Sequence, residues 1–410
     1  MGLLPWAVLA FGTTLLAAGA AAGVALAPFR ASAAATTWVE RARLAFPARV
    51  VSRFALVLLP LAFAVFAALA PPEVPVWWPS AVPTPVVVAV PALVAAAVVR
   101  LHVERVLRGR RVGAGEMVAG WVALWAVMFP HAAVAIAGLA VVADAFDART
   151  WLALSATTLA VLGAFAGVGV HVARGLGVVH PASERLRRAV AAASDATKVV
   201  PRRLYEVDLL MANAFALPAA RAMLFTREAL SALDDAQIAA VARHELGHVS
   251  EPPRTIAARA GCAILMVVGL VAARPIAGAL TPPDQPLLRA VFAVLVIFNA
   301  VVISRFVLRP LAHRLEVRAD AIARTHDAHD GEYAGALEAI YAANLMPAVT
   351  HARGAHPHLY DRLVAAGAPP PWPRPAPPSR PRLRAALAVC MGITAVAVAL
   401  ALSLSDTSLF

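Results

Sequence analysis

The sequence predicts a mainly α-helical, polytopic membrane protein with about eight spans and a small α+β domain assembled from two cytosolic segments. Of its 410 residues, 61% are hydrophobic and 15% are charged, whereas a soluble domain has about 45–50% apolar and about 25% charged residues. The apolar residues gather in blocks of about twenty, the length of a membrane-spanning helix. This hydrophobicity excludes a soluble globular enzyme and a disordered chain. The two cysteines are too few for a disulfide-rich secreted domain.

Eight apolar blocks have the length that a helix needs to cross the hydrocarbon core of a bilayer. The first block resembles a signal peptide, but no basic region precedes it and its apolar run is too long, so we interpret it as an anchor. The third block is the weakest because prolines interrupt it. The predicted spans are residues 3–27, 54–70, 82–99, 117–143, 151–173, 260–280, 287–308 and 385–402.

The arginines between the spans predict the orientation of the chain. Loops 28–53 and 100–116 each carry five arginines, while the loops that follow them carry one basic residue between them, Arg149. Basic loops stay on the cytosolic side, which places the N-terminus outside and the long segments 174–259 and 309–384 in the cytosol. Because the charge follows the topology, we attribute the net charge of +12 to the positive-inside rule and not to nucleic-acid binding.

Neither cytosolic segment is long enough to bury a sizeable core alone, so we expect the two to form one domain. Prolines crowd the end of the second segment and predict a stiff linker to the last span. The predicted division is 1–173, five transmembrane helices; 174–259, first part of the cytosolic domain; 260–308, a transmembrane hairpin; 309–367, second part of that domain; 368–384, the linker; and 385–410, a C-terminal transmembrane helix with a short tail.

Residues 244–248 of the first cytosolic segment read His-Glu-Leu-Gly-His. On a helix, positions i and i+4 share a face, so His244 and His248 could bind one zinc ion. Glu245 would then lie beside the metal, where it can take a proton from water. Asp234 and Gln237 form a capping pair that predicts a helix over 236–249.

A zinc hydrolase needs a third protein ligand and an open fourth position. The metzincin pattern is excluded because Glu251 and Arg254 occupy the positions of its further glycine and histidine. Beyond the hairpin, Glu316 and Asp320 stand at i and i+4 on one helical face. We expect Glu316 to ligate one zinc per chain and Asp320 to accept the N–H of a ligand histidine. The alternative is that both belong to a solvated charged face.

These motifs resemble the HtpX and type I CaaX prenyl protease family of integral-membrane zinc metallopeptidases, over about residues 204–363 and the interleaved hairpin. The resemblance implies a gluzincin-like, zincin-type domain in which an edge strand holds the substrate by main-chain hydrogen bonds. It also implies that a histidine before a proline and a downstream arginine stabilise the tetrahedral oxyanion. The corresponding residues are Asn213, Ala214, Phe215 and Ala216 for the substrate, with His356 and Arg362 as catalytic residues.

The sequence thus predicts a zinc metalloendopeptidase (EC 3.4.24 type) in a bacterial inner membrane, which cleaves membrane-associated or misfolded proteins at the cytosolic face. One alternative is an intramembrane site-2-type protease, but charged residues flank the histidine motif. A second is a catalytically silent scaffold or signalling protein that retains a zinc-stabilised domain. A transporter is disfavoured because the spans offer too few midplane polar groups.

Overall fold

The computed structural model describes residues 3–32, 37–69, 84–109, 111–282, 285–327, 329–351 and 357–406. Within these residues the chain is mainly helical, with one small sheet. It divides into two compact units, one of residues 1–114, 345–351 and 374–410 and one of residues 115–344 and 352–373. The six-part division predicted from the sequence stays a prediction.

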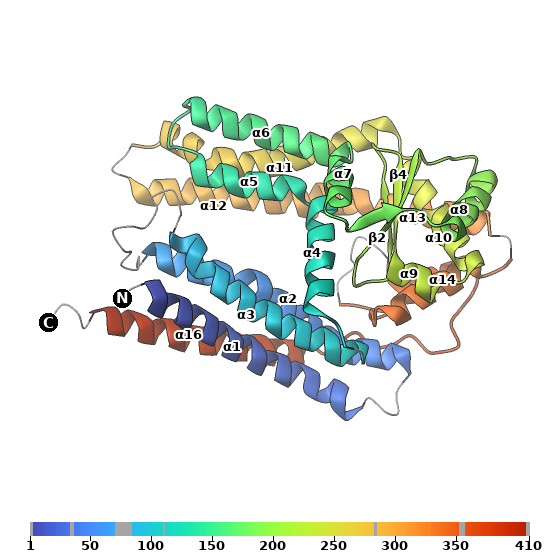
Figure 1. The fold of residues 1–410 in the computed structure, drawn as a ribbon, viewed down its shortest axis with the longest axis horizontal. Coiled ribbons are helices and arrows are strands. Elements are labelled where there is room, and N and C mark those ends of the chain that lie inside the picture. Colours follow the sequence, from blue (N-terminus) through green and yellow to red (C-terminus); the bar gives the residue numbers. More distant parts are fainter. Residues whose placement is uncertain are drawn as a thin grey trace. The chain divides into compact units, whose positions relative to one another are not determined.

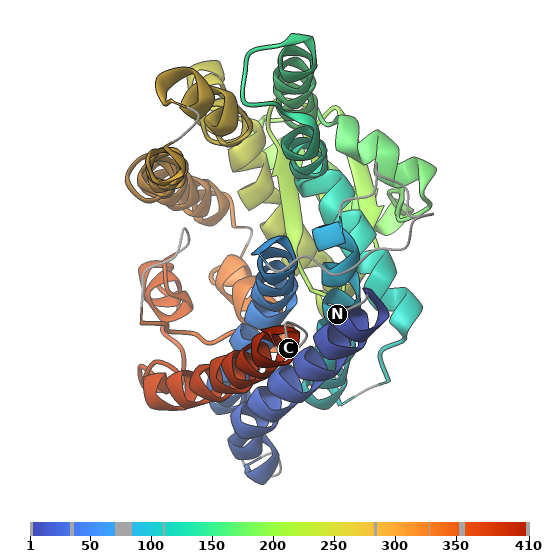
Figure 2. The ribbon, with the colours of Figure 1, turned by 90° about the vertical axis from the view of Figure 1, so that its left-hand side faces the viewer.

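The first unit is a bundle of four long helices. Alanines dominate the face that helix α1 buries, at positions 17, 18, 21, 22 and 25, each at most 2% exposed. Small side chains let helices approach closely, as in membrane bundles, and Figures 1 and 2 show α1 alongside α16. The helices are α1 (Leu3–Ala31), α2 (Trp38–Leu69), α3 (Thr84–Arg108) and α16 (Arg380–Asp406).

The second unit contains a group of apolar helices and the sheet with its own helices. Helices α5, α6, α11 and α12 run side by side (Figure 1). The apolar elements are α4 (Ala114–Met128), α5 (Pro130–Val141), α6 (Ala148–Phe165), α7 (Val168–Gly175), α11 (Pro253–Leu280), α12 (Pro286–Val302) and the π-helix Ile303–Leu308.

Among the described residues, six helices are long and apolar enough to cross a membrane, namely α1, α2, α3, α6, α11 and α16. They are consistent with a polytopic membrane protein. The fourth predicted span, 117–143, was wrong as a single helix: α4 and α5 meet at Pro130 with a bend of 83°, because proline cannot continue the hydrogen-bond ladder. The fifth, 151–173, breaks at Gly167, whose φ is +81°. The count of eight spans stays a prediction.

The sheet has four strands in the order β1-β2-β4-β3. Strand β4 is parallel to β2 and antiparallel to β3, with Phe215 opposite Leu224. The edge strand that the resemblance implies at residues 213–216 corresponds to β3, which stands at one end of the strand order, next to β4. The bounds are β1 (Val179–Pro181), β2 (Arg203–Val207), β3 (Ala214–Leu217) and β4 (Ala222–Thr226).

Broken apolar helices help to build the core on one side of this sheet. Val127 of α4 and Val170 of α7 lie in one buried cluster with Tyr205, Val207 and Leu224 of the sheet. Part of the region predicted to be purely transmembrane therefore packs on the small domain. This packing follows from the breaks at Pro130 and Gly167, which turn short apolar helices toward the sheet.

The remaining helices all belong to the second unit. The proline-rich stretch between α15 and α16 forms no helix or strand, as the sequence predicted. The helices are α8 (Glu184–Thr197), α9 (Arg227–Ala232), α10 (Asp235–Val249), α13 (Arg309–Thr325), α14 (Glu332–Ala343) and α15 (Leu359–Ala365).

Candidate metal centre

Helix α10 presents the two motif histidines on one face. It starts with the predicted capping box, in which the side chains of Asp234 and Gln237 each accept from the other's backbone N–H; a cap of this kind contributes about 1 kcal/mol. The rings of His244 and His248 lie edge to face with centroids 5.0 Å apart. Both histidines and Glu245 are buried or nearly so, so the motif faces the interior of the domain.

Helix α13 crosses α10 at close range. A Cβ at Gly247 would lie 3.0 Å from the Cα of Ala319, so the glycine permits the approach. Arg318 of α13 donates to the carbonyl of Gly247 at 3.0 Å and to the hydroxyl of Ser250 at 3.0 Å, placing a cation at the C-terminal end of α10, where the helix dipole favours it. This crossing brings Glu316 to the histidines.

Three potential ligands converge at the crossing. The Nε2 atom of His244 lies 3.5 Å from Oε2 of Glu316, and Nε2 of His248 lies 3.4 Å from Oε1 of the same carboxylate. Zinc bonds of about 2.0–2.2 Å in tetrahedral geometry separate neighbouring ligand atoms by roughly 3.3–3.5 Å. Two imidazoles and one carboxylate are also the donor set of a catalytic zinc site. The residues present therefore fit this metal.

Electrostatics at the crossing favour positive charge. Burial lowers the pKa of His248, but hydrogen bonds to Glu251 and Glu316 outweigh it and raise the pKa to about 10. Burial likewise opposes protonation of His244, and hydrogen bonds to Asp320 and Glu316 raise its pKa overall. The negative charge of Glu245 adds to both effects. The same carboxylate charges would stabilise a divalent metal ion bound by the Nε2 atoms of the two histidines.

The Nδ1 atom of His244 faces a buried polar network. It lies 3.1 Å from Oδ1 of Asp320 and 2.7 Å from the hydroxyl of Tyr333. Arg362 donates Nε and Nη2 to the two oxygens of Asp320, at 2.9 and 2.6 Å. Despite the cost of burying the Asp320 carboxylate, its partners His244 and Arg362 lower its pKa, so Asp320 is held ionised behind the histidine.

The second histidine has its own carboxylate. Nδ1 of His248 lies 3.0 Å from Oε1 of Glu251, whose other oxygen accepts from Arg259 of α11 at 2.8 Å. Carboxylates that hold the outer nitrogen of a ligand histidine fix its orientation. From the sequence we used Glu251 to exclude the metzincin pattern and as a charge beside the motif, although its spacing of three residues from His248 carried the signal.

The charges beside the motif differ in exposure: Arg254 is exposed, whereas Arg243 and Glu251 are buried and paired. Arg243 is 4% exposed and contacts Asp327 at 3.0 Å and Glu332 at 2.9 Å. Helix α10 is not among the described helices apolar enough to cross a membrane. An intramembrane site-2-type arrangement places its motif inside such a helix, so this geometry disfavours it.

The predicted substrate strand lies at one end of the sheet order. The hydroxyl of Thr226 in β4 bonds the backbone N–H and carbonyl of Asn213, at 2.9 and 3.0 Å. Just before it, the side chain of Asn344 accepts from the N–H of Ala212 and donates to its carbonyl. The strand that follows, with Ala214, Phe215 and Ala216, contacts α10. Sequence reasoning missed Asn344, which lies far away in the chain.

The two predicted oxyanion residues have different outcomes. His356 lies outside the described residues. Arg362 is only 7% exposed, and its described contacts are with Asp320, Tyr333 and Tyr341. The guanidinium donates to Asp320 and Tyr333, and its role at the oxyanion stays a prediction. A cavity of about 240 Å³ borders Arg362, Asp320 and Tyr333.

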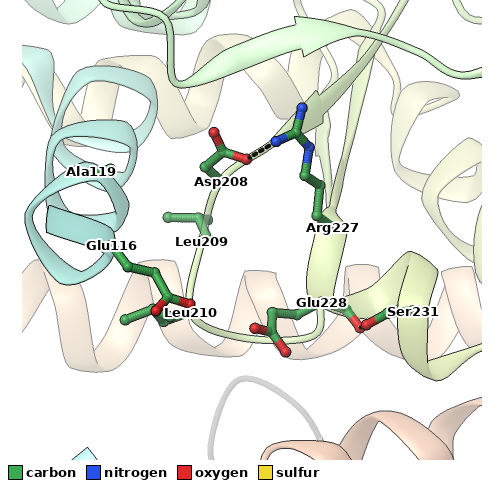
Figure 3. Close-up of a pocket in the computed structure, with 8 residues that line it drawn as sticks. All are labelled: Glu116, Ala119, Asp208, Leu209, Leu210, Arg227, Glu228 and Ser231. Carbon is green, nitrogen blue, oxygen red and sulfur yellow. Dashed lines mark hydrogen bonds and ion pairs between the residues drawn. The ribbon is translucent and has the colours of Figure 1, made fainter. Parts of the chain in front are cut away.

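A second cavity, of about 420 Å³, lies between α4, α9 and the segment before β3. Figure 3 shows the ion pair of Asp208 with Arg227 on one side of it and the carboxylates of Glu116 and Glu228 on the other. Among the residues that the structure describes, the group whose side chains could jointly hold a metal is His244, His248 and Glu316. We therefore place the candidate centre at the crossing of α10 and α13.

Comparison with known proteins identifies a family for the segment that contains these residues. Residues 181–370 match the model of peptidase family M48, which contains HtpX and the CaaX prenyl proteases and is zinc-dependent. The matched segment includes β2 to β4, α10, α13 and α14. The resemblance seen in the sequence is thereby confirmed. No curated protein matches the chain.

Proposed function

Since residues 181–370 match the model of peptidase family M48, a match that supports a zinc metallopeptidase, we propose that the chain is a membrane-embedded endopeptidase that cleaves membrane-associated or misfolded proteins. The observation that carries this proposal is the convergence of His244, His248 and Glu316 next to Glu245. A family match alone would also suit a domain that has lost turnover, whereas this arrangement retains a complete donor set and a base.

In the proposed site, His244, His248 and Glu316 hold the metal, and Asp320 lies 3.1 Å from the outer nitrogen of His244. A bound zinc ion supplies Lewis acidity, which lowers the pKa of water and polarises the scissile carbonyl. Glu245 takes the proton of the attacking water and passes it to the leaving amine. Its burial (8% exposed) strengthens this role, because a carboxylate away from bulk water interacts more strongly with its partners.

Peptide substrates would add to the sheet at β3, along Asn213, Ala214, Phe215 and Ala216. A strand bound through main-chain groups carries little side-chain selectivity, which suits misfolded proteins as substrates. Strand β3 contacts α10, so a peptide aligned with it would pass the motif helix. His356 remains proposed as an oxyanion donor, whereas the described contacts of Arg362 support a role behind Asp320.

The proposed location is the inner membrane of a bacterium, with the site at the cytosolic face. The arginines of loops 28–53 and 100–116 support this orientation through the positive-inside rule. Helix α11, which follows α10 after two prolines, is one of the helices apolar enough to cross a membrane. The motif would then lie within a few residues of the membrane surface, close to membrane-associated substrates.

Proteolysis with and without metal tests this function. We expect the detergent-purified chain to degrade unfolded casein, to stop when 1,10-phenanthroline removes the metal, and to recover with one equivalent of zinc, because the base has no activated water without the ion. A protease that needs no metal serves as the control, because the inhibitor should leave its degradation of casein unchanged. Degradation that continues in demonstrably zinc-free protein would contradict the proposal.

A further inference from the structure

We propose that Tyr333 is a positioning residue of the metal centre. Its hydroxyl, oriented by Arg362 and Asp320, accepts a hydrogen bond from the Nδ1–H group of His244. This hydrogen bond keeps the Nε2 lone pair of His244 directed toward the metal. The inference rests on the proposed function and deepens it. Tyr333 stands 89 residues from His244 in the chain, on α14, and no sequence motif pointed to it.

The direction of each hydrogen bond follows from the chemistry of the partners. Arg362 has donors only and gives Nη2 to the Tyr333 hydroxyl at 2.7 Å. The ionised Asp320 has acceptors only, so the hydroxyl gives its single proton to Oδ1 at 2.6 Å. What remains at the hydroxyl is one acceptor position, and His244 Nδ1 lies 2.7 Å from it. His244 must therefore donate, and its proton is fixed on Nδ1.

Burial and ring geometry make this arrangement rigid. Tyr333 is 2% exposed, so its hydroxyl is largely withdrawn from bulk water and depends on these partners for its hydrogen bonds. Its ring lies nearly parallel to that of His244, with centroids 5.7 Å apart and an interplanar angle of 18°. The hydroxyl of Tyr333 thus keeps the proton of His244 on Nδ1, and the ring of Tyr333 fixes the orientation of the imidazole plane.

Without the hydroxyl, Nδ1 of His244 retains only Oδ1 of Asp320, at the longer distance of 3.1 Å. Partners of ligand histidines typically affect metal affinity by about 10–100-fold. We therefore expect Tyr333→Phe, which keeps the ring and its stacking, to weaken zinc binding by roughly 10–100-fold.

The test measures the zinc dissociation constant of full-length protein in detergent by competition with a chelating dye. Tyr341→Phe is the matched control, because it removes another buried hydroxyl of α14 that bonds to Arg362, whereas the described contacts of His244 Nδ1 are with Tyr333 and Asp320. The proposal expects Tyr341→Phe to stay within about 3-fold of wild type, near the low end of what one ordinary hydrogen bond contributes. The visible spectrum of the cobalt-substituted Tyr333→Phe protein should also shift, which a loss of stability alone would not cause.

The outcomes separate this inference from the function on which it rests. Wild type without any zinc affinity would overturn the proposed function itself. Wild type that binds zinc, with Tyr333→Phe at the same affinity, would overturn the role of Tyr333, as would equal losses in both variants. If Tyr333→Phe fails to fold, 3-fluorotyrosine at position 333 keeps the hydroxyl but makes it a weaker acceptor; an unchanged affinity there would also overturn the inference.

Discussion

Replacing Glu245 by glutamine is expected to lower the rate of peptide hydrolysis by about 10²–10⁴-fold while zinc content stays at the wild-type level. Glutamine has nearly the same shape but cannot take a proton from water. The metal donors at the crossing, His244, His248 and Glu316, are unchanged by the substitution. The measurement compares casein degradation and zinc per chain for wild type and variant.

Glu184→Gln provides the matched control, since it makes the same substitution at a side chain that is 67% exposed on α8. It should retain full activity. The scaffold alternative makes the opposite prediction, because a silent protein would keep its cellular effect in the Glu245→Gln strain. A variant that retains wild-type turnover would remove Glu245 from the mechanism.

Replacing Arg243 by methionine is expected to destabilise the small domain by about 3–5 kcal/mol, because it leaves buried carboxylates without their cation. The guanidinium is the shared partner of Asp327 and Glu332, whose side chains are each 12% exposed. These contacts tie the motif helix α10 to the start of α14, which carries Tyr333. Thermal unfolding in detergent should show a Tm lower by roughly 10 °C.

Two further variants define what this result means. Arg187→Met removes an arginine that is 58% exposed, and its Tm should change by little, as for other surface pairs. Adding Asp327→Asn and Glu332→Gln to Arg243→Met should recover part of the lost stability, because the repulsion between the two unpaired carboxylates disappears. A Tm for Arg243→Met equal to that of Arg187→Met would show that the buried pairs do not hold the domain together.

The local features of the site could be predicted because they depend on short spacings. The i,i+4 histidines, the capping box of Asp234 and Gln237, and the pair Glu316 and Asp320 each fall on one helix, where spacing determines which side chains share a face. The six apolar helices followed in the same way from local hydrophobicity.

Other features depend on contacts between distant segments and could not be predicted. Tyr333 reaches His244 across 89 residues, and Asn344 reaches Ala212 across 132. The position of Arg362 behind Asp320 likewise depends on how α13, α14 and α15 pack. Hydropathy also could not show that α4 and α7 pack on the sheet, because an apolar helix reads the same against lipid and against a protein core.

The most direct test of the account is the zinc content of detergent-purified wild type and of Glu316→Ala, measured by elemental analysis, with Glu184→Ala as the control for a surface carboxylate. The account predicts about one zinc per chain in wild type and in the control. Glu316→Ala should hold clearly less, because α13 would no longer complete the site begun by His244 and His248. Wild type that contains no zinc and cannot be refilled, or a Glu316→Ala variant that binds as wild type does, would contradict a metal centre built across the hairpin.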